Sequence, residues 1–239
     1  PVYPVHPVNI LRRDEIGRTV GDALWPARFN VQHLENTKEK IGSYSFASLF
    51  QQHPVPAEGG LFKREWFRHI VDRAPHGLIW KRGYDLGITA NPTSDYTASF
   101  RVAYDKEGNL YIDGGFRKRI EYPDQRRYVL GRIREELDTE HGIEDTANGS
   151  AVVQELRKEV RLQGRAFRAI KAKGDKVSRS LAWMNLAEAG NLRLVRAAWN
   201  NEFIDEACAF PLGTHDDQID AVSIAVAMHA KHKYGAYGF

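Results

Sequence analysis

Residues 213–230, with the sequence GTHDDQIDAVSIAVAMHA, place three aspartates at the start of an otherwise apolar segment. The run of Ala, Val, Ile and Met is typical of a buried helix, and a helix N-terminus attracts one acid because its free N–H groups and dipole favour an anion. Asp216 and Asp217 each stand about one helical turn before Asp220, and like charges at those spacings repel. The cluster therefore predicts a compensating charge, for which a divalent cation is the simplest candidate.

The composition is that of a chain able to bury a sizeable core. It has 239 residues, 42% of them hydrophobic, and a net charge of +3, a mild excess that permits nucleic-acid binding without demanding it. The single cysteine, Cys208, excludes an internal disulfide framework and a cysteine-based zinc site, as is usual in a reducing cytoplasm. No run approaches the roughly 20 apolar residues of a membrane span, and no signal segment opens the chain. We expect a soluble globular protein without membrane contact.

The first part of the chain differs in character from the rest. Residues 1–77 hold seven of the ten prolines, several Trp and Phe side chains, and a helix-like patch at residues 31–54. We expect a linker or extension here that packs on a domain formed by residues 78–239. Because the chain begins with Pro1 instead of methionine, we also expect a piece of a longer polypeptide.

The pattern of residues 78–239 predicts alternating strands and helices. Strands are expected at residues 78–88, 97–104, 109–116, 142–145, 167–172 and 192–195. Helices are expected at residues 123–141, 150–163 and 175–190 and in the C-terminal part. Ile133 and Leu137 would share the apolar face of the first of these helices. The order favours an α/β fold in which a mixed central sheet, with an antiparallel group at its start, carries helices on both faces.

Several acids lie where these elements begin or end. Asp85 lies in the first predicted strand, and Glu144 closes the fourth. Asp217 and Asp220 open the last long helix. Each alone also fits a structural role, as a turn residue, a solvated loop acid or a helix cap. Together they would converge at one edge of the sheet and form an oxygen-rich site of the kind that Mg²⁺ or Mn²⁺ prefers.

Four segments, in their order and spacing, carry a resemblance to a known family: YDLGITANPTSDYTA, IEDTANG, KGDKVSRS and HDDQIDA. They resemble the C-terminal nuclease domain of the large terminase subunit of tailed bacteriophages, the motor that packages viral DNA. The upstream pieces LWPARF, FASLFQQHPVPAEGGLF and REWF resemble the segment that joins the terminase ATPase to its nuclease. The resemblance implies an RNase H-like fold. It also implies an endonuclease that cuts double-stranded viral DNA concatemers during genome packaging with two divalent cations, Mg²⁺ or Mn²⁺.

The resemblance assigns the metal ligands residue by residue. Asp85 matches the first-strand aspartate that bridges both metals. Glu144 matches the acid that closes the fourth strand, with the neighbouring Asp145 as the alternative ligand. Asp217 matches the acid of the last helix, and Asp220 a further acid that some relatives use. The expected catalytic residues are therefore Asp85, Glu144 and Asp217, joined by Asp220 as a metal ligand.

Other residues are expected to support this site. Asp95 matches a recurrent aspartate of the family, and Asp145 and Asp216 stand beside the predicted ligands. His215 would orient the nucleophilic water or contact a phosphate. Its alternative is a solvent-exposed histidine at the entrance of a helix.

Two basic clusters stand near the predicted acids. Their members are Lys171, Lys173, Lys176 and Arg179 in one, and Arg117, Lys118 and Arg119 in the other. Cationic side chains at a helix entrance favour phosphate, whereas a solvated charge run is the alternative interpretation. Neither cluster is built for base readout, so we expect double-stranded DNA to be bound with little sequence specificity.

The sequence contains no phosphate-binding loop of the form GxxxxGK[ST], so we expect no nucleotide hydrolysis by this chain. The resemblance implies work in the host cytoplasm, with a terminase ATPase domain in the same full-length chain and with the portal and small terminase subunit as partners. We expect the isolated chain to be a monomer. Two alternatives remain: an RNase H-like junction resolvase or transposase-type nuclease, and a non-catalytic DNA-binding assembly module with structural acids.

Overall fold

The computed structural model describes residues 22–51, 60–87, 95–144, 154–156, 158–160, 167–171 and 174–233. The chain divides into two compact units, Pro1–Gly59 and Gly60–Phe239. Throughout the described ranges, no helix combines the length and the apolar character that crossing a lipid bilayer requires.

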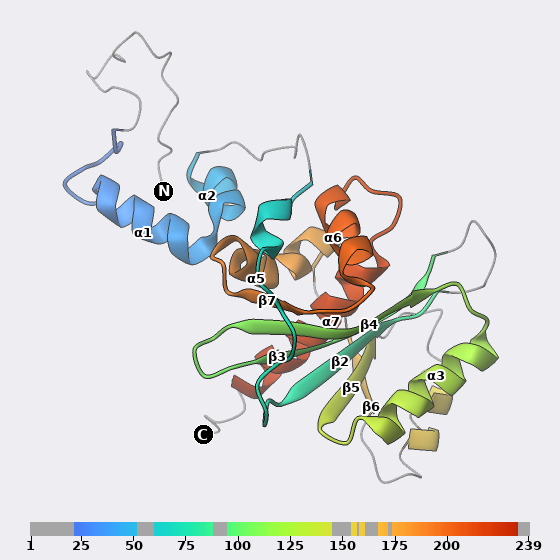
Figure 1. The fold of residues 1–239 in the computed structure, drawn as a ribbon. Coiled ribbons are helices and arrows are strands. Elements are labelled where there is room, and N and C mark those ends of the chain that lie inside the picture. Colours follow the sequence, from blue (N-terminus) through green and yellow to red (C-terminus); the bar gives the residue numbers. More distant parts are fainter. Residues whose placement is uncertain are drawn as a thin grey trace. The chain divides into compact units, whose positions relative to one another are not determined.

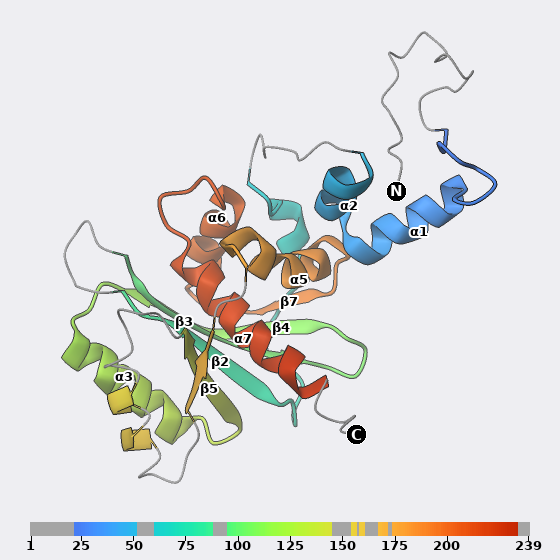
Figure 2. The same ribbon diagram turned by 180° about the vertical axis from the view of Figure 1, so that it is seen from behind.

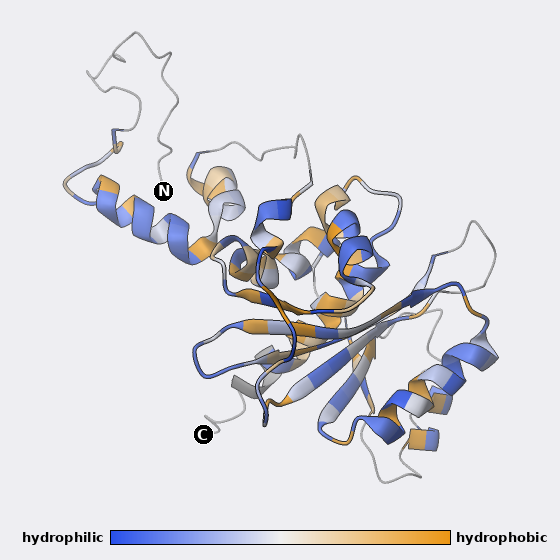
Figure 3. Cartoon of the chain, in the orientation of Figure 1, coloured by the Kyte–Doolittle hydropathy of each residue, from blue (hydrophilic) through white to orange (hydrophobic). Residues whose placement is uncertain are grey.

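The described part of the first unit is a pair of helices, α1 (Val31–Ile41) and α2 (Ser43–Phe50). The helix-like patch expected there is thus two helices. They are joined at Gly42, whose φ of 82° is in the left-handed region that favours glycine. In Figure 3 the ribbon of α1 is coloured largely as hydrophilic. The small core of this unit consists of Ala23, Leu34 and Phe46.

The second unit is built on a seven-stranded sheet of order β1-β7-β4-β3-β2-β5-β6 (Figure 1). Its strands are β1 (Ile70–Val71), β2 (Trp80–Asp85), β3 (Thr97–Tyr104), β4 (Leu110–Lys118), β5 (Thr139–Glu144), β6 (Phe167–Ile170) and β7 (Leu192–Val195). The strands β2, β3 and β4 form an antiparallel meander, and the other neighbouring pairs are parallel. The predicted mixed sheet is therefore confirmed.

Helices cover both faces of this sheet. They are η1 (Arg64–Phe67), α3 (Tyr122–Glu135), α5 (Lys176–Glu188), α6 (Asn200–Ala209) and α7 (Asp217–Lys233), with further helical residues at 154–156 and 158–160. The helix α7 lies behind the sheet in Figure 1 and in front of it in Figure 2, packed on β2 and β3. The helix α3 covers the opposite face, where its apolar side chains meet Tyr84, Ile143 and Phe167.

The second unit begins earlier than the sequence pattern suggests. Phe62 stacks on Trp183 with ring centroids 4.2 Å apart, and Phe67 meets Phe203 edge-on at 6.0 Å. The strand β1 pairs with β7 in the same sheet. The structure therefore divides the chain between residues 59 and 60, not at the expected boundary after residue 77. The strand β1 has only two residues, which is too short to produce a recognisable alternation of apolar and polar residues. The sequence of residues 60–77 therefore predicted a linker.

The helix α3 is shorter than predicted. It ends at Glu135, and Leu137 lies outside the helix with 73% of its surface exposed. Residues 139–141, predicted as its last turn, belong to β5, where Thr139 pairs with Trp80 of β2. The apolar spacing from Ile133 to Leu137 fits a helix. Residues 139–141 nevertheless form hydrogen bonds with β2 in the sheet and therefore leave the helix. The strand is consequently longer than the predicted range 142–145 on its N-terminal side.

A buried ion pair lies between the sheet and the end of α3. The Arg82 guanidinium donates to both carboxylate oxygens of Glu136, at 2.7 and 2.6 Å. Its third nitrogen donates to the Ser99 hydroxyl at 3.0 Å and to the Gly114 carbonyl at 2.9 Å. Arg82 has no exposed surface, and Glu136 has 8%. The pair therefore ties β2 to its neighbours on the face that α3 covers.

Two adjacent glycines bring α7 onto the other face. Gly83 of β2 and Gly142 of β5 are direct neighbours in the sheet. A Cβ atom on Gly83 would lie 2.1 Å from the carbonyl oxygen of Ala221, and one on Gly142 would lie 2.5 Å from the sulfur of Met228. A larger residue at Gly83 would push the α7 backbone away, and one at Gly142 would displace the Met228 side chain. We call Gly83 and Gly142 the glycine pair.

Candidate active site

Asp85 and Glu144 close two adjacent parallel strands. Tyr84 of β2 pairs with Ile143 of β5, so the acids that follow stand side by side at the carboxyl ends of both strands. Successive side chains of a strand point to opposite faces. Each acid comes two positions after a member of the glycine pair, so both acids point to the face that α7 covers.

Two more acids reach the same place from the first turn of α7. The side chains of Asp217 and Asp220 are each 4% exposed. Burial, followed by the negative charges of the other three acids, raises the pKa of Asp85 well above its ordinary value. The structure thus brings together Asp85, Glu144, Asp217 and Asp220, which the sequence assigned to one site.

Asp217 carries a poorly compensated charge. Within the described residues its Oδ2 atom is buried without a hydrogen-bond partner, and the Nδ1 atom of His215 stands 3.8 Å from it. Burial, with the charges of Glu206 and Asp95, raises its pKa from 3.8 to about 6. A hydrogen bond from the Tyr96 backbone opposes this rise. Asp217 therefore has an oxygen available to a further ligand.

Glu206 of α6 was not anticipated from the sequence. Its carboxylate accepts hydrogen bonds from the backbone N–H of Gln218 at 2.8 Å and from the Gln218 side chain at 2.7 Å. It also lies 3.2 Å from the Nε atom of Arg117. Because Gln218 belongs to the first turn of α7, Glu206 satisfies a free N–H group at this helix end. This contact fixes the turn that carries Asp217.

One predicted basic cluster lies directly on the acids. The helix α5 begins at Lys176, after Asp175 caps it by accepting from the Ser178 backbone at 2.7 Å. Lys176 reaches Asp216 at 2.6 Å and Asp220 at 3.2 Å. Arg179 donates to Asp220 at 2.7 Å and stands 3.8 Å from Glu144. Of the other predicted members, Lys171 is exposed, whereas Lys173 lies outside the described residues, as does Asp145.

The second basic cluster is split between the two faces of the sheet. Arg117, only 12% exposed, pairs with Glu202 at 2.5 Å and with Glu206, and lies 3.7 Å from the Tyr96 ring. Arg119 covers the same ring and donates to its hydroxyl at 2.8 Å, with another nitrogen 3.5 Å from His215. Tyr96, which the sequence analysis did not single out, thus links these cations to the acid site.

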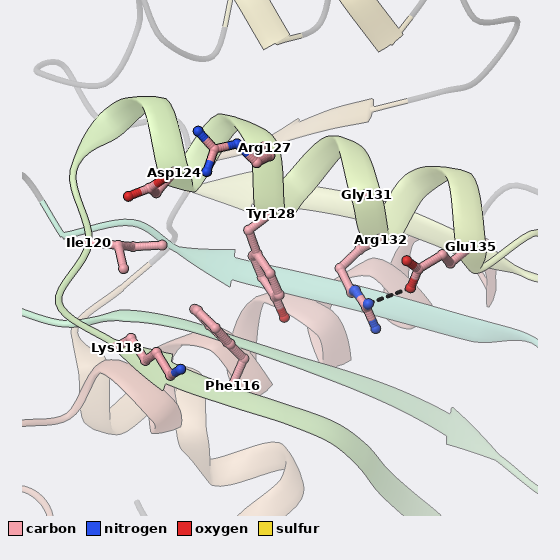
Figure 4. Close-up of a pocket in the computed structure, with 9 residues that line it drawn as sticks. All are labelled: Phe116, Lys118, Ile120, Asp124, Arg127, Tyr128, Gly131, Arg132 and Glu135. Atoms are coloured by element: carbon pink, nitrogen blue, oxygen red, sulfur yellow. Dashed lines mark hydrogen bonds and ion pairs between the residues drawn. The ribbon is translucent and has the colours of Figure 1, made fainter.

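Lys118 points the other way, toward a groove between β4 and α3 (Figure 4). The groove has a volume of about 380 Å³, and Phe116 stacks on Tyr128 beside it with ring centroids 3.9 Å apart. Its lining consists of Phe116, Lys118, Ile120, Asp124, Arg127, Tyr128, Gly131, Arg132 and Glu135. None of the predicted metal ligands belongs to it.

The donor set of the acid site fits a hard divalent cation. In the part of the chain that the structure describes, no three His, Cys, Asp or Glu side chains already stand in the geometry of a metal site. Cationic side chains of α5 bridge the acids instead. The four carboxylates, the unpartnered Oδ2 of Asp217 and the repulsion that raises the pKa of Asp85 are nevertheless features that a divalent cation satisfies.

The antiparallel meander, the parallel strand β5 beside it, and acids at the ends of β2, β5 and the start of α7 define the chain as an RNase H-like α/β protein. A sequence profile described as the terminase RNaseH-like domain matches residues 82–229, and the chain belongs to this family. No curated protein matches the chain in a sequence search.

Solved structures share the fold. The large terminase nuclease from thermophilic phage G20c with bound magnesium is 17% identical, over 72% of this chain and 98% of that one, with a TM-score of 0.50. The large terminase nuclease domain of Thermus phage P74-26 is also 17% identical, over 75% of this chain and 98% of that one, with a TM-score of 0.51. The HK97 bacteriophage large terminase is 11% identical with a TM-score of 0.50, and 83% of this chain matches 50% of that one. The chain therefore spans about half of the HK97 protein.

Proposed function

We propose that this chain is a metal-dependent endonuclease that cuts double-stranded viral DNA concatemers during genome packaging. The convergence of Asp85, Glu144, Asp217 and Asp220 at one edge of the sheet carries the proposal. Membership of the terminase RNaseH-like family and the magnesium bound by the G20c nuclease support it. We further propose that the chain works in the host cytoplasm beside a terminase ATPase domain of the same polypeptide, with the portal and small terminase subunit as partners.

In this proposal, two divalent cations, Mg²⁺ or Mn²⁺, would activate a water molecule on one side of the phosphodiester and stabilise the leaving 3′ oxygen on the other. Asp85, whose pKa is raised by burial and by the charges of the other three acids, would be shared between the two ions. Glu144 would hold one ion, and Asp217 with Asp220 the other. His215, close to Asp217, would orient the attacking water or a phosphate oxygen, and Arg119 would hold the imidazole in place.

DNA would approach along the cations that border the acids. Lys171 is exposed, and Arg119, Lys176 and Arg179 surround the predicted ligands. Contacts of this kind neutralise phosphates and do not recognise the bases, so DNA binding would depend on salt and show little sequence specificity. Arg117 contributes differently, because its pairs with Glu202 and Glu206 hold α6 against β4.

The test is cleavage of supercoiled plasmid with Mn²⁺, Mg²⁺ or EDTA. Asp85→Asn and Asp217→Asn should each abolish cleavage, and their combination should add little, because both serve one site. Asp220→Asn should be milder. Asp72→Asn, at a side chain 85% exposed and paired only with Arg196 among the described residues, is the matched control. Full activity of Asp217→Asn would contradict the assignment.

The same assay separates the alternatives. A junction resolvase would cut branched DNA in preference to linear or plasmid duplex. A non-catalytic assembly module would bind DNA and leave it intact with every metal.

A further inference from the structure

The first turn of α5 directs two cations at the acids of the site. The Arg179 guanidinium lies between Asp220, at 2.7 Å, and Glu144, at 3.8 Å. Lys176 lies between Asp220, at 3.2 Å, and Asp216, at 2.6 Å. Asp220 is 4% exposed and Arg179 is 18% exposed, so these charges interact with little screening by water. The two side chains therefore neutralise part of the acid cluster from within the protein.

These contacts compete with metal coordination for the same oxygens. An oxygen of Asp220 that accepts a hydrogen bond from Arg179 directs a lone pair to the guanidinium, and a second cation at the same place would be repelled. Arg179 cannot release Asp220 by losing a proton, because an arginine stays charged at every working pH. Metal can reach these oxygens only if the side chains move.

We propose that Arg179 and Lys176 are internal counter-ions of the acid site, which divalent metal displaces and which then bind DNA phosphates. The inference rests on the proposed function and extends it, because it couples the binding of divalent metal to the binding of DNA. The backbone needs no change, because Asp175 caps α5 and only long, flexible side chains must swing. Metal frees cations for DNA, and by reciprocal linkage bound DNA must favour metal by the same factor.

The experiment is a calorimetric titration of the chain with Mn²⁺ in the absence of DNA. Arg179→Gln keeps a hydrogen-bond donor for Asp220 and removes the charge, so the dissociation constant for Mn²⁺ should fall about tenfold or more. Lys176→Ala, at a side chain 52% exposed, should give a smaller fall. Arg127→Ala is the control. It removes one charge from α3, at a side chain 78% exposed on the other face of the sheet, and should leave the constant unchanged.

Duplex binding provides the second readout. Measured by fluorescence anisotropy with Ca²⁺ or EDTA at equal ionic strength, wild-type affinity should rise with Ca²⁺, and Arg179→Gln should lose much of that rise. Melting curves check that each variant folds. If Arg179→Gln does not fold, Lys176→Ala decides the question with the same two measurements.

The possible failures are distinguishable. A wild-type chain that binds no Mn²⁺ would overturn the metal-dependent function together with the inference. A wild-type chain that binds Mn²⁺, with Arg179→Gln and Lys176→Ala binding it equally well, would overturn the counter-ion role alone. A fall in the dissociation constant of the same size in Arg127→Ala would also overturn it, because a general loss of positive charge would then explain the effect.

Discussion

Replacing Asp217 with asparagine should stabilise the metal-free protein at neutral pH and remove part of the pH dependence of its stability. The pKa of Asp217 rises from 3.8 to about 6, chiefly through burial and then through the charges of Glu206 and Asp95. One pKa unit corresponds to about 1.4 kcal/mol. The ionised Asp217 carboxylate therefore destabilises the native state by about 3 kcal/mol at pH 7.

The sign of the effect follows from the direction of the pKa shift. Because the folded-state pKa of Asp217 is above its unfolded value, the native state binds the proton more tightly. Its stabilising contribution is complete below about pH 4 and is lost as pH rises through about 6. An asparagine does not titrate there. The variant should thus match the wild type near pH 4 and exceed it by about 3 kcal/mol at pH 7, less whatever an unpaired amide costs.

The assay is urea denaturation in EDTA at several pH values between about 4.5 and 7.5. The control Asp72→Asn should change stability by no more than about 0.5 kcal/mol, because that side chain is 85% exposed. A difference for Asp217→Asn that does not vary with pH would refute the electrostatic account of the site. Saturating Mn²⁺ should reverse the ranking, because a ligand that binds only the native state stabilises the wild type more.

Three further changes test the scaffold by urea denaturation. Gly83→Ala should cost about 1–3 kcal/mol and weaken Mn²⁺ binding, because the new Cβ would lie 2.1 Å from the Ala221 backbone; unaltered stability would mean that α7 can move away freely. Glu136→Ala should cost about 3–5 kcal/mol by leaving Arg82 buried and unpaired, and a loss near zero would show that water reaches the guanidinium. Leu137→Ser should change stability by no more than about 0.5 kcal/mol, since 73% of the residue is exposed; a large loss would place it back in the core.

Much of the fold follows from local patterns, and the order of strands and helices is the clearest case. Strand pairing does not. The acids Asp85 and Glu144 are neighbours because β5 pairs with β2, although β3, β4 and α3 lie between them in sequence. Hydrophobic period shows which residues are buried and gives no information on which strands are adjacent. The positions of the acids at strand ends and at a helix start suggested that they converge, and the resemblance to a family assigned them to one metal site.

The contacts that Glu206 and Arg117 make around the site could not be predicted from the sequence for a related reason. Glu206 lies in the segment NNEFIDEACAF, where acids at helical spacing are typical of a solvated face. Only packing of α6 against the start of α7 brings it to Gln218. Arg117 read as a free cation because its partners Glu202 and Glu206 are far away in the chain. Such long-range pairs leave no trace in residue spacing.

The close approach of α7 to the glycine pair fixes the spacing of the carboxylates in the site. Backbone atoms of α7 pack against Gly83 and the Met228 side chain packs against Gly142, so these close contacts set the separation between the strand acids and the helix acids. Substitutions that repack the core elsewhere should consequently leave the spacing of the carboxylates intact. A transplant of this site into another sheet would have to carry both glycines along with the four acids.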